Sequence, residues 1–445
     1  MTRANLQPLY FGTEASQAFH TQLERLRDQL NPVAQFLAPL PFGADLSRTS
    51  ADLILLPQLS GAAYQMLEVF RSQPLPMVVL TSEFCSTAIW DWEITGWLRS
   101  AGIDVFTPYE FRQTEILCRA VAAKRELSQS RFLVFQDDIG AGLYADMFQR
   151  FYWWQRENSQ RMFERFGISV EERSLLQLTE AVRGVSDDQL RSVWEVWQPR
   201  LPIVNVPDKA LDDTLRLYVA LKRLLAEEPQ IQGLGINCIN EFPSMLATPC
   251  LVWNMLYQDH QLIWGCEADT LSMMTQHLVD RCLATPAVMT NIYPFLVGQP
   301  VLDHMDISAF PKVADARNYL LAGHCGYLGV LPQSYAVESW ALRPSVIDVF
   351  EGRGGAIDGR LPLGEMLLVK LNPDCAGWTV IEGDLEDYHH VPQSGLSKVA
   401  AVIRVGDGPA LLDQITSQHY ILTQGAAAAD FKMLAKVFGM DVNWL

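Results

Sequence analysis

Three acidic residues follow two apolar stretches of the chain, and their side chains are the ones from which a reactive site could be built. Glu241 comes shortly after residues 233–239, an apolar stretch with two glycines that predicts a buried strand. Glu267 and Asp269 come directly after residues 262–266, which predict a second short strand. Carboxylates can bind a divalent cation or carry protons during a reaction.

The segments around these acids predict a parallel α/β unit. We expect one helix from about residue 244 to residue 257 and another from about residue 270, where apolar residues recur at helical spacing. Ligands of open parallel sheets bind beyond the carboxyl ends of the strands. The three acids fall there, so they could converge on one cation. Alternatively, Asp269 is only the N-cap of the following helix, and the two glutamates are solvated surface residues.

Composition narrows the class of protein. A chain of 445 residues, 49% of them hydrophobic, predicts a globular protein of two or three domains. The net charge of −17 argues against nucleic acid or an anionic membrane as a partner. Eight cysteines without Cys-x-x-Cys pairs predict buried free thiols. With no signal sequence or membrane-spanning run expected, these features favour a cytoplasmic protein.

Alternating strand and helix patterns predict the domain organisation. Residues 1–130 and 131–295 each predict an α/β domain with a doubly wound parallel sheet of the Rossmann or flavodoxin type, the second carrying the acidic motifs. From residue 296 onward, glycines and prolines are dense and helices are few. Residues 296–445 therefore predict a mainly antiparallel, barrel-like domain, closed by a terminal helix at residues 430–438.

Two aromatic segments have more than one interpretation. Trp90 and Trp92 follow the third predicted strand, and both could simply pack beneath the next helix. A helix expected over residues 143–166 carries many aromatic side chains, which is typical of a core or an oligomer contact rather than a cofactor site. His389 and His390 lie in an acidic segment, where we expect a solvent-exposed loop.

Several short motifs resemble those of the L-fucose isomerase and L-arabinose isomerase superfamily. Gly-Cys-Glu-Ala-Asp-Thr-Leu at residues 265–271 is similar to that family's Cys-Glu-x-Asp or Glu-x-Asp-Ser-Leu segment. The other similar segments, which follow the family's order, are residues 237–243, 248–251, 324–326, 364–370 and 418–420. The chain departs from the family at residues 290–294, where an aspartate is usual, and at Tyr420, where a second histidine is usual.

The resemblance implies an aldose–ketose isomerase, an intramolecular oxidoreductase that moves a proton between C1 and C2 through an enediol. A divalent metal, with Mn²⁺ preferred over Mg²⁺, would stabilise the negative charge that develops on the oxygens of C1 and C2. The residue roles that the resemblance implies are metal binding by Glu241, Asp269 and His419, catalysis by Glu241 and Asp269, and substrate binding by Trp90, Glu267 and His324.

The resemblance also implies a homo-oligomer, a trimer or a hexamer, in which Trp90 reaches the neighbouring subunit's sugar. Two alternatives stay open. One is a metal-dependent sugar aldolase or lyase on the same scaffold, and the other is a non-catalytic sugar-binding or regulatory protein. His324 could also be a strand-end histidine that only bonds to the backbone.

Overall fold

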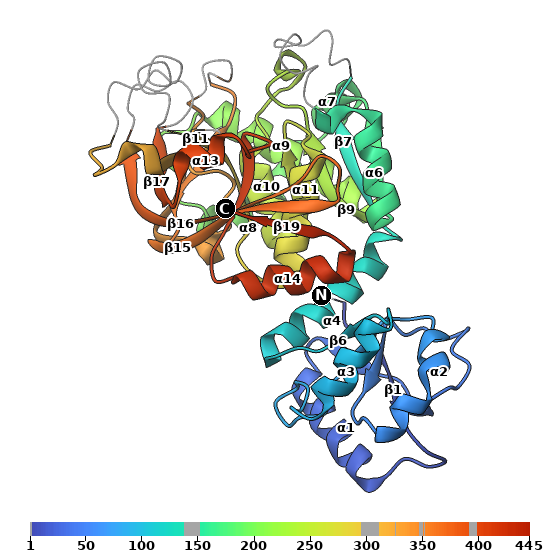
Figure 1. Ribbon diagram of the computed structural model, residues 1–445. Coiled ribbons are helices and arrows are strands. Elements are labelled where there is room, and N and C mark those ends of the chain that lie inside the picture. Colours follow the sequence, from blue (N-terminus) through green and yellow to red (C-terminus); the bar gives the residue numbers. More distant parts are fainter. Residues whose placement is uncertain are drawn as a thin grey trace. The chain divides into compact units, whose positions relative to one another are not determined.

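The computed structural model describes residues 2–137, 152–294, 311–324, 326–346, 350, 352–390 and 398–445. These residues form a mixed α/β structure with two parallel sheets and a closed antiparallel barrel, which confirms the predicted fold class at that level (Figure 1). They divide into two compact units, the first made of residues 1–128, 281–283 and 427–439 and the second of residues 129–280, 284–426 and 440–445. The predicted boundary at residue 295 lies outside the described residues.

The first unit is built on a parallel sheet in the order β2-β1-β4-β5-β6, with β3 paired to β1. Its strands are β1 (Ala4–Tyr10), β2 (Ala34–Phe36), β3 (Leu40–Pro41), β4 (Leu53–Leu56), β5 (Met77–Val79) and β6 (Val105–Phe106). Its helices include α1 (Gln17–Leu30), α2 (Leu67–Arg71), α3 (Asp91–Ser100) and α4 (Phe111–Leu127). Helix α1 begins where the Ser16 hydroxyl accepts the Phe19 backbone N–H, and it buries one apolar face.

The terminal helix α14 (Ala428–Phe438) belongs to this first unit. Arg112 of α4 donates to Asp430 at 2.8 Å, and Lys436 donates to the carbonyl of Val105 at 2.8 Å. The sequence predicted a helix here correctly. The expectation that it closes the C-terminal barrel is wrong, because its partners are α4 and β6.

The second unit contains a parallel sheet in the order β10-β9-β7-β8. The strands are β7 (Arg131–Phe135), β8 (Ser169–Arg173), β9 (Ile231–Ile236) and β10 (Ile263–Cys266). The accompanying helices are α6 (Arg156–Phe166), α7 (Leu175–Arg183), α8 (Asp187–Trp197), α9 (Asp208–Glu227), α10 (Cys250–His260) and α11 (Thr270–Leu278). Strands β9 and β10 confirm the two strands predicted before the acidic residues.

Two predicted helices have different limits in the structure. The helix expected from residue 244 begins only at Cys250, because Phe242–Ser244 forms a 3₁₀ turn and Pro249 occupies the N-cap. In the aromatic segment, Tyr152–Trp154 is a short 3₁₀ helix and α6 begins at Arg156. Residues 143–151 of that predicted helix lie outside the described residues.

Glycines allow α11 to approach β9 and β10 closely. A Cβ added at Gly265 would lie 2.7 Å from the Met273 side chain, and one at Gly233 would lie 2.8 Å from it. Met273 therefore packs directly over the strand backbones. This close approach fixes the N-terminus of α11 beside the carboxyl end of β10.

Six antiparallel strands close into the barrel, in the order β15-β18-β11-β12-β17-β16 and back to β15. They are β11 (Val288–Pro294), β12 (Tyr319–Gly323), β15 (Gly364–Leu371), β16 (Gly377–His390), β17 (Val399–Val405) and β18 (His419–Thr423). Strand β19 (Asp441–Trp444) pairs with β16 in parallel. Strands β13 (Val337–Pro344) and β14 (Gly355–Arg360) form a separate antiparallel pair. Helix α13 (Gly408–Leu412) is short.

Apolar side chains from all six barrel strands form one core, which includes Ile292, Leu320, Leu368, Ile403 and Leu422. The expected loop at His389 and His390 is wrong, because both residues end β16. His390 is exposed and His389 is half-buried. Within the residues that the structure describes, no helix is long and apolar enough to cross a membrane.

Candidate active site

A strained turn carries Glu267 from the end of β10 to the start of α11. Glu267 and Ala268 have φ values of +54° and +51°, a region that residues with a side chain rarely adopt. The turn is closed by a hydrogen bond of 3.1 Å from the Asp269 N–H to the Cys266 carbonyl. It is also held from outside, because the Ala268 N–H donates to Ile236 of β9 and Trp154 Nε1 donates to the Glu267 carbonyl. These bonds hold the backbone of Glu267 in place.

Asp269 is the N-cap of α11 and is fully buried. Its Oδ1 accepts the Ser272 backbone N–H at 2.8 Å. Its Oδ2 accepts the Ser272 hydroxyl at 2.7 Å and Lys370 Nζ at 2.8 Å, and lies 2.9 Å from His419 Nδ1. Oδ2 therefore takes three of the four contacts and Oδ1 takes one.

Lys370 is a lysine inside an otherwise apolar part of the barrel strand β15. It is fully buried, and its ammonium donates both to Asp269 and, at 2.6 Å, to the Ser272 hydroxyl. The ring of Trp153 lies 5.6 Å from the same ammonium, within the range of a cation–π contact. The charge is thus compensated by one carboxylate, one hydroxyl and one aromatic face.

His419 lies at the start of β18, fully buried, between Asp269 and Glu267. Because an ionised carboxylate only accepts hydrogen bonds, the contact with Asp269 places a proton on Nδ1. In a neutral imidazole the opposite nitrogen, Nε2, then carries a lone pair. That nitrogen is 3.6 Å from Glu267 Oε2, which is too long for a hydrogen bond. We call Glu267, Asp269, Lys370 and His419 the acid–histidine cluster.

Three buried polar atoms around this cluster have no hydrogen-bond partner among the described residues. They are Glu267 Oε2, His419 Nε2 and His324 Nε2. His324 lies just after β12, and its ring is 5.5 Å from the ring of His419, edge to face. Trp153 covers His419 with ring centroids 5.4 Å apart. Buried atoms of this kind ordinarily have a partner, so these three are atoms that a ligand or ion could bond.

Burial and charge shift the ionisation of the cluster in opposite directions. Burial alone would raise the pKa of Asp269, but Lys370 and His419 outweigh it and lower that pKa below its ordinary value. Burial raises the pKa of Glu267, and Asp269 adds to the rise while His419 opposes it. Burial lowers the pKa of Lys370 against the pull of Asp269, and lowers the pKa of His324 to about 3. His324 is therefore neutral at physiological pH.

The cluster fits a divalent cation in part. Two ligand atoms that each lie about 2.1 Å from one ion are about 3.0–3.4 Å apart, close to the 3.6 Å between Glu267 Oε2 and His419 Nε2. Neither Glu267 Oε2 nor the lone pair of His419 Nε2 supplies a hydrogen to the other, so both atoms could act as ligands of a cation. Nevertheless, in the described part of the chain no three histidine, cysteine or acidic side chains meet as a ready-made metal site.

Glu241 has its own set of contacts at the carboxyl ends of β7 and β9. Its Oε2 accepts the backbone N–H of Asp137 at 2.7 Å, and Asn237 Nδ2 approaches its Oε1 at 3.5 Å. The side chain is buried, with an exposed fraction of 6%. The structure thus brings together Glu267, Asp269, His324 and His419, whereas the contacts described for Glu241 lie with Asp137 and Asn237. The expectation that the glutamates are solvated surface residues is wrong for both.

In the first unit, Trp90 is exposed. Its exposed fraction is 84%, and that of its neighbour Ile89 is 77%. The interpretation that it packs beneath the following helix is therefore wrong for Trp90. Trp92 is partly covered, because its Nε1 donates to the Thr87 carbonyl at 2.9 Å and its ring faces Tyr109. The loop before α3 thus presents an apolar surface that includes a tryptophan.

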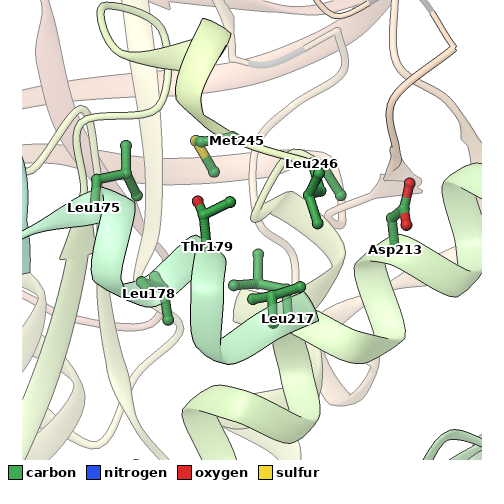
Figure 2. Close-up of a pocket in the computed structure, with 9 residues that line it drawn as sticks. Leu175, Leu178, Thr179, Asp213, Leu217, Met245 and Leu246 are labelled. Carbon is green, nitrogen blue, oxygen red and sulfur yellow. The ribbon is translucent and has the colours of Figure 1, made fainter. Parts of the chain in front are cut away.

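A separate apolar cavity in the second unit is too small for a sugar. It lies between α7, α9 and residues 245–247, and Leu175, Leu178 and Met245 line it (Figure 2). Its volume is about 10 Å³, whereas small-molecule pockets measure about 300–1,000 Å³. The cavity has room for about one water molecule.

Sequence analysis missed three residues of the site, Lys370, Ser272 and Trp153. A signal for Lys370 was present, because a lysine within Met-Leu-Leu-Val-Lys-Leu must find a buried partner if the strand is buried. Ser272 could have been expected from its place three residues after an N-cap. For Trp153, the aromatic pattern gave no indication of which face meets the site.

No family model and no curated protein matches the chain. Among solved structures, a LacI family transcription regulator from Clostridium acetobutylicum is similar at 8% identity, with a TM-score of 0.15. That match covers 63% of this chain and 93% of the regulator. A likeness this weak bears on neither fold nor function, so function has to be inferred from the cluster and from the sequence motifs.

Proposed function

We propose that this chain is a metal-dependent aldose–ketose isomerase with the architecture of the L-fucose and L-arabinose isomerase superfamily. That architecture has two doubly wound, flavodoxin-like domains followed by a barrel. The strand orders β2-β1-β4-β5 and β8-β7-β9-β10 support it, since both follow the 2-1-3-4 succession with which flavodoxin-type sheets begin.

The observation that carries the proposal is the acid–histidine cluster. Two carboxylates from the end of one parallel strand meet a histidine from a barrel strand, although about 150 residues separate them in sequence. The motifs that supply these residues are those that resemble the superfamily. Perturbed carboxylates and unpaired atoms in one buried place are typical of reactive sites rather than of a structural core.

An aldose–ketose isomerase has to remove a proton from a carbon next to a carbonyl group. When bound, a divalent cation, with Mn²⁺ preferred over Mg²⁺, supplies positive charge next to the sugar oxygens on which negative charge develops. The chain supplies the proton carrier, and Glu241 is our candidate because it follows β9, the neighbour of β10. Trp153 covers one side of His419 and excludes water there.

Trp90 is assigned to the sugar-binding surface of a neighbouring subunit. Its indole is exposed and lies in a loop fixed by hydrogen bonds, such as that from Ala88 N–H to Thr81. An exposed aromatic surface favours a protein contact. We therefore propose a homo-oligomer. The seven cysteines in the described residues are buried and form no disulfide bond with one another, which favours the cytoplasm.

The test is proton exchange. Purified protein with Mn²⁺ is incubated in D₂O with a panel of neutral and charged aldoses, and ¹H NMR follows loss of the C2 proton signal and formation of ketose. We expect exchange that requires Glu241 and stops with EDTA. Two smaller products would identify an aldolase. Sugar binding that is unaffected by EDTA, without exchange on any member of the panel, would identify a binding protein and refute the proposal.

A further inference from the structure

The contacts of Asp269 and Glu267 suggest other roles for these residues than the sequence motifs do, which imply metal binding by Asp269 and substrate binding by Glu267. Asp269 makes four contacts with three residues, and one of these is a buried ion pair. Glu267, two residues earlier, has an oxygen that no described residue bonds, and that oxygen faces His419 Nε2. At the Asp269 oxygen that faces His419, a cation would compete with Lys370 and Ser272, whereas Glu267 Oε2 has no hydrogen-bond partner among the described residues.

We propose that a divalent cation binds between Glu267 Oε2 and His419 Nε2, and that Asp269, held by Lys370, orients His419 instead of binding the ion. The inference rests on the cation of the proposed function but not on the isomerisation itself. It moves a metal-ligand role from Asp269 to Glu267 and makes Lys370 a positioning residue.

The arrangement Asp269–His419–ion matches a general rule of metal sites. A ligating histidine ordinarily donates its other N–H to a carboxylate or carbonyl, and this contact fixes both the tautomer and the ring orientation. Here the Asp269 contact at 2.9 Å directs the lone pair of Nε2 toward Glu267. Lys370 in turn keeps Asp269 in place.

The charges of these side chains also support Glu267 as the ligand and Asp269 as the orienting residue. Asp269 and Lys370 compensate one another, so the pair brings no net charge to the site. Glu267 then supplies negative charge on the Nε2 side of the histidine. The backbone of Glu267 is held in a left-handed conformation by bonds to Trp154 and, through Ala268, to Ile236. Such strain persists where the surroundings fix a conformation for a function.

The experiment compares metal binding, not turnover, in three variants of the full-length protein. Glu267→Gln removes the proposed ligand charge. Asp269→Asn combined with Lys370→Met removes the ion pair as a unit and leaves a single amide oxygen. That oxygen can cap α11 or accept from His419 but not both, because the two contacts use different oxygens in the wild type. Glu365→Gln, an exposed glutamate at the start of β15, is the matched control. Co²⁺ is titrated into each protein, and the visible absorption spectrum reports the ligands of the bound ion.

We expect the wild type and the control to bind one Co²⁺ with the same spectrum. Glu267→Gln should lose the spectrum, with binding weakened at least ~100-fold. The double variant should keep the band positions with binding weakened about 10–100-fold, the usual effect of altering a residue that orients a ligand. Loss of the ion from the double variant, or an unchanged spectrum in Glu267→Gln, would overturn the inference.

A crystal structure of the wild type with Mn²⁺ tests the same point without any substitution, in case the double variant fails to fold. The anomalous peak should lie beside Glu267 and His419, with Asp269 still bonded to Lys370. A peak bonded to Asp269 would overturn the inference. The outcome is separate from the reaction, because an ion bound as described without activity on any aldose refutes the isomerase and leaves this division of roles intact.

Discussion

Replacing Lys370 by methionine should strongly destabilise the second unit. Nζ lies 2.8 Å from Asp269 Oδ2, and both side chains have no exposed surface. At an effective dielectric constant of about 20, the attraction over this distance is about 6 kcal/mol. The cost of bringing both charges out of water offsets part of it. Removing one partner of a buried pair typically costs about 3–5 kcal/mol, because the other charge is left without compensation.

Denaturant unfolding followed by circular dichroism measures this effect. Lys370→Met alone should lower the free energy of unfolding by about 3–5 kcal/mol. Asp269→Asn combined with Lys370→Met should cost less than Lys370→Met alone, because no charge remains unpaired. Lys432→Met, an exposed lysine on α14, is the control and should stay within about 0.5 kcal/mol of the wild type. A cost below about 1 kcal/mol for Lys370→Met would refute the ion pair.

Three further predictions test other parts of the molecule. Removing metal with EDTA should lower the melting temperature and Mn²⁺ should restore it, since an ion at 100 times its dissociation constant adds about 2.7 kcal/mol of stability; no response to either would contradict a cation site. Trp90→Ala should weaken sugar binding by about 1–3 kcal/mol and leave Co²⁺ binding unchanged. Calorimetry measures both affinities. Mixed oligomers of Trp90→Ala and Glu267→Gln subunits should regain activity, because one subunit then supplies Trp90 to a neighbour with an intact Glu267. A monomer in sedimentation would exclude a sugar site that two subunits share. Gly265→Ala should cost about 1–3 kcal/mol of stability by pushing a Cβ into Met273, whereas Gly406→Ala, with nothing within 4 Å, should cost much less; equal effects would refute the close packing of α11.

The fold was largely predictable because its signals are local. Apolar stretches bounded by turn residues located β9 and β10, and the dense glycines and prolines after residue 296 indicated antiparallel strands. What local patterns could not give was closure of the barrel, which depends on pairing β15 with both β16 and β18. They also could not assign α14 to the first unit, because an amphipathic helix shows that it has a buried face but not which element covers that face.

The site was predictable to the extent that motifs mark it. Asp269 and His419 were expected to meet, and they do so at 2.9 Å. Lys370 was missed because its partner lies 101 residues earlier in the chain, and no local pattern relates a strand lysine to a helix N-cap. The position of Glu267 depends on two left-handed residues, which the sequence Glu-Ala does not predict.

The sequence left two alternatives for Asp269, an N-cap or a member of a reactive site, and the structure shows an N-cap whose second oxygen also contacts Lys370 and His419. Oδ1 bonds the backbone of Ser272 and begins α11, while Oδ2 faces Lys370 and His419. The positive end of the helix and the ammonium both stabilise the ionised carboxylate, in agreement with its lowered pKa. A carboxylate held this firmly is poorly suited to exchange partners during a reaction but well suited to hold a histidine. The capping position therefore supports the proposed role of Asp269 in orienting His419, while Glu267, on the strained turn, keeps an oxygen that no described residue bonds.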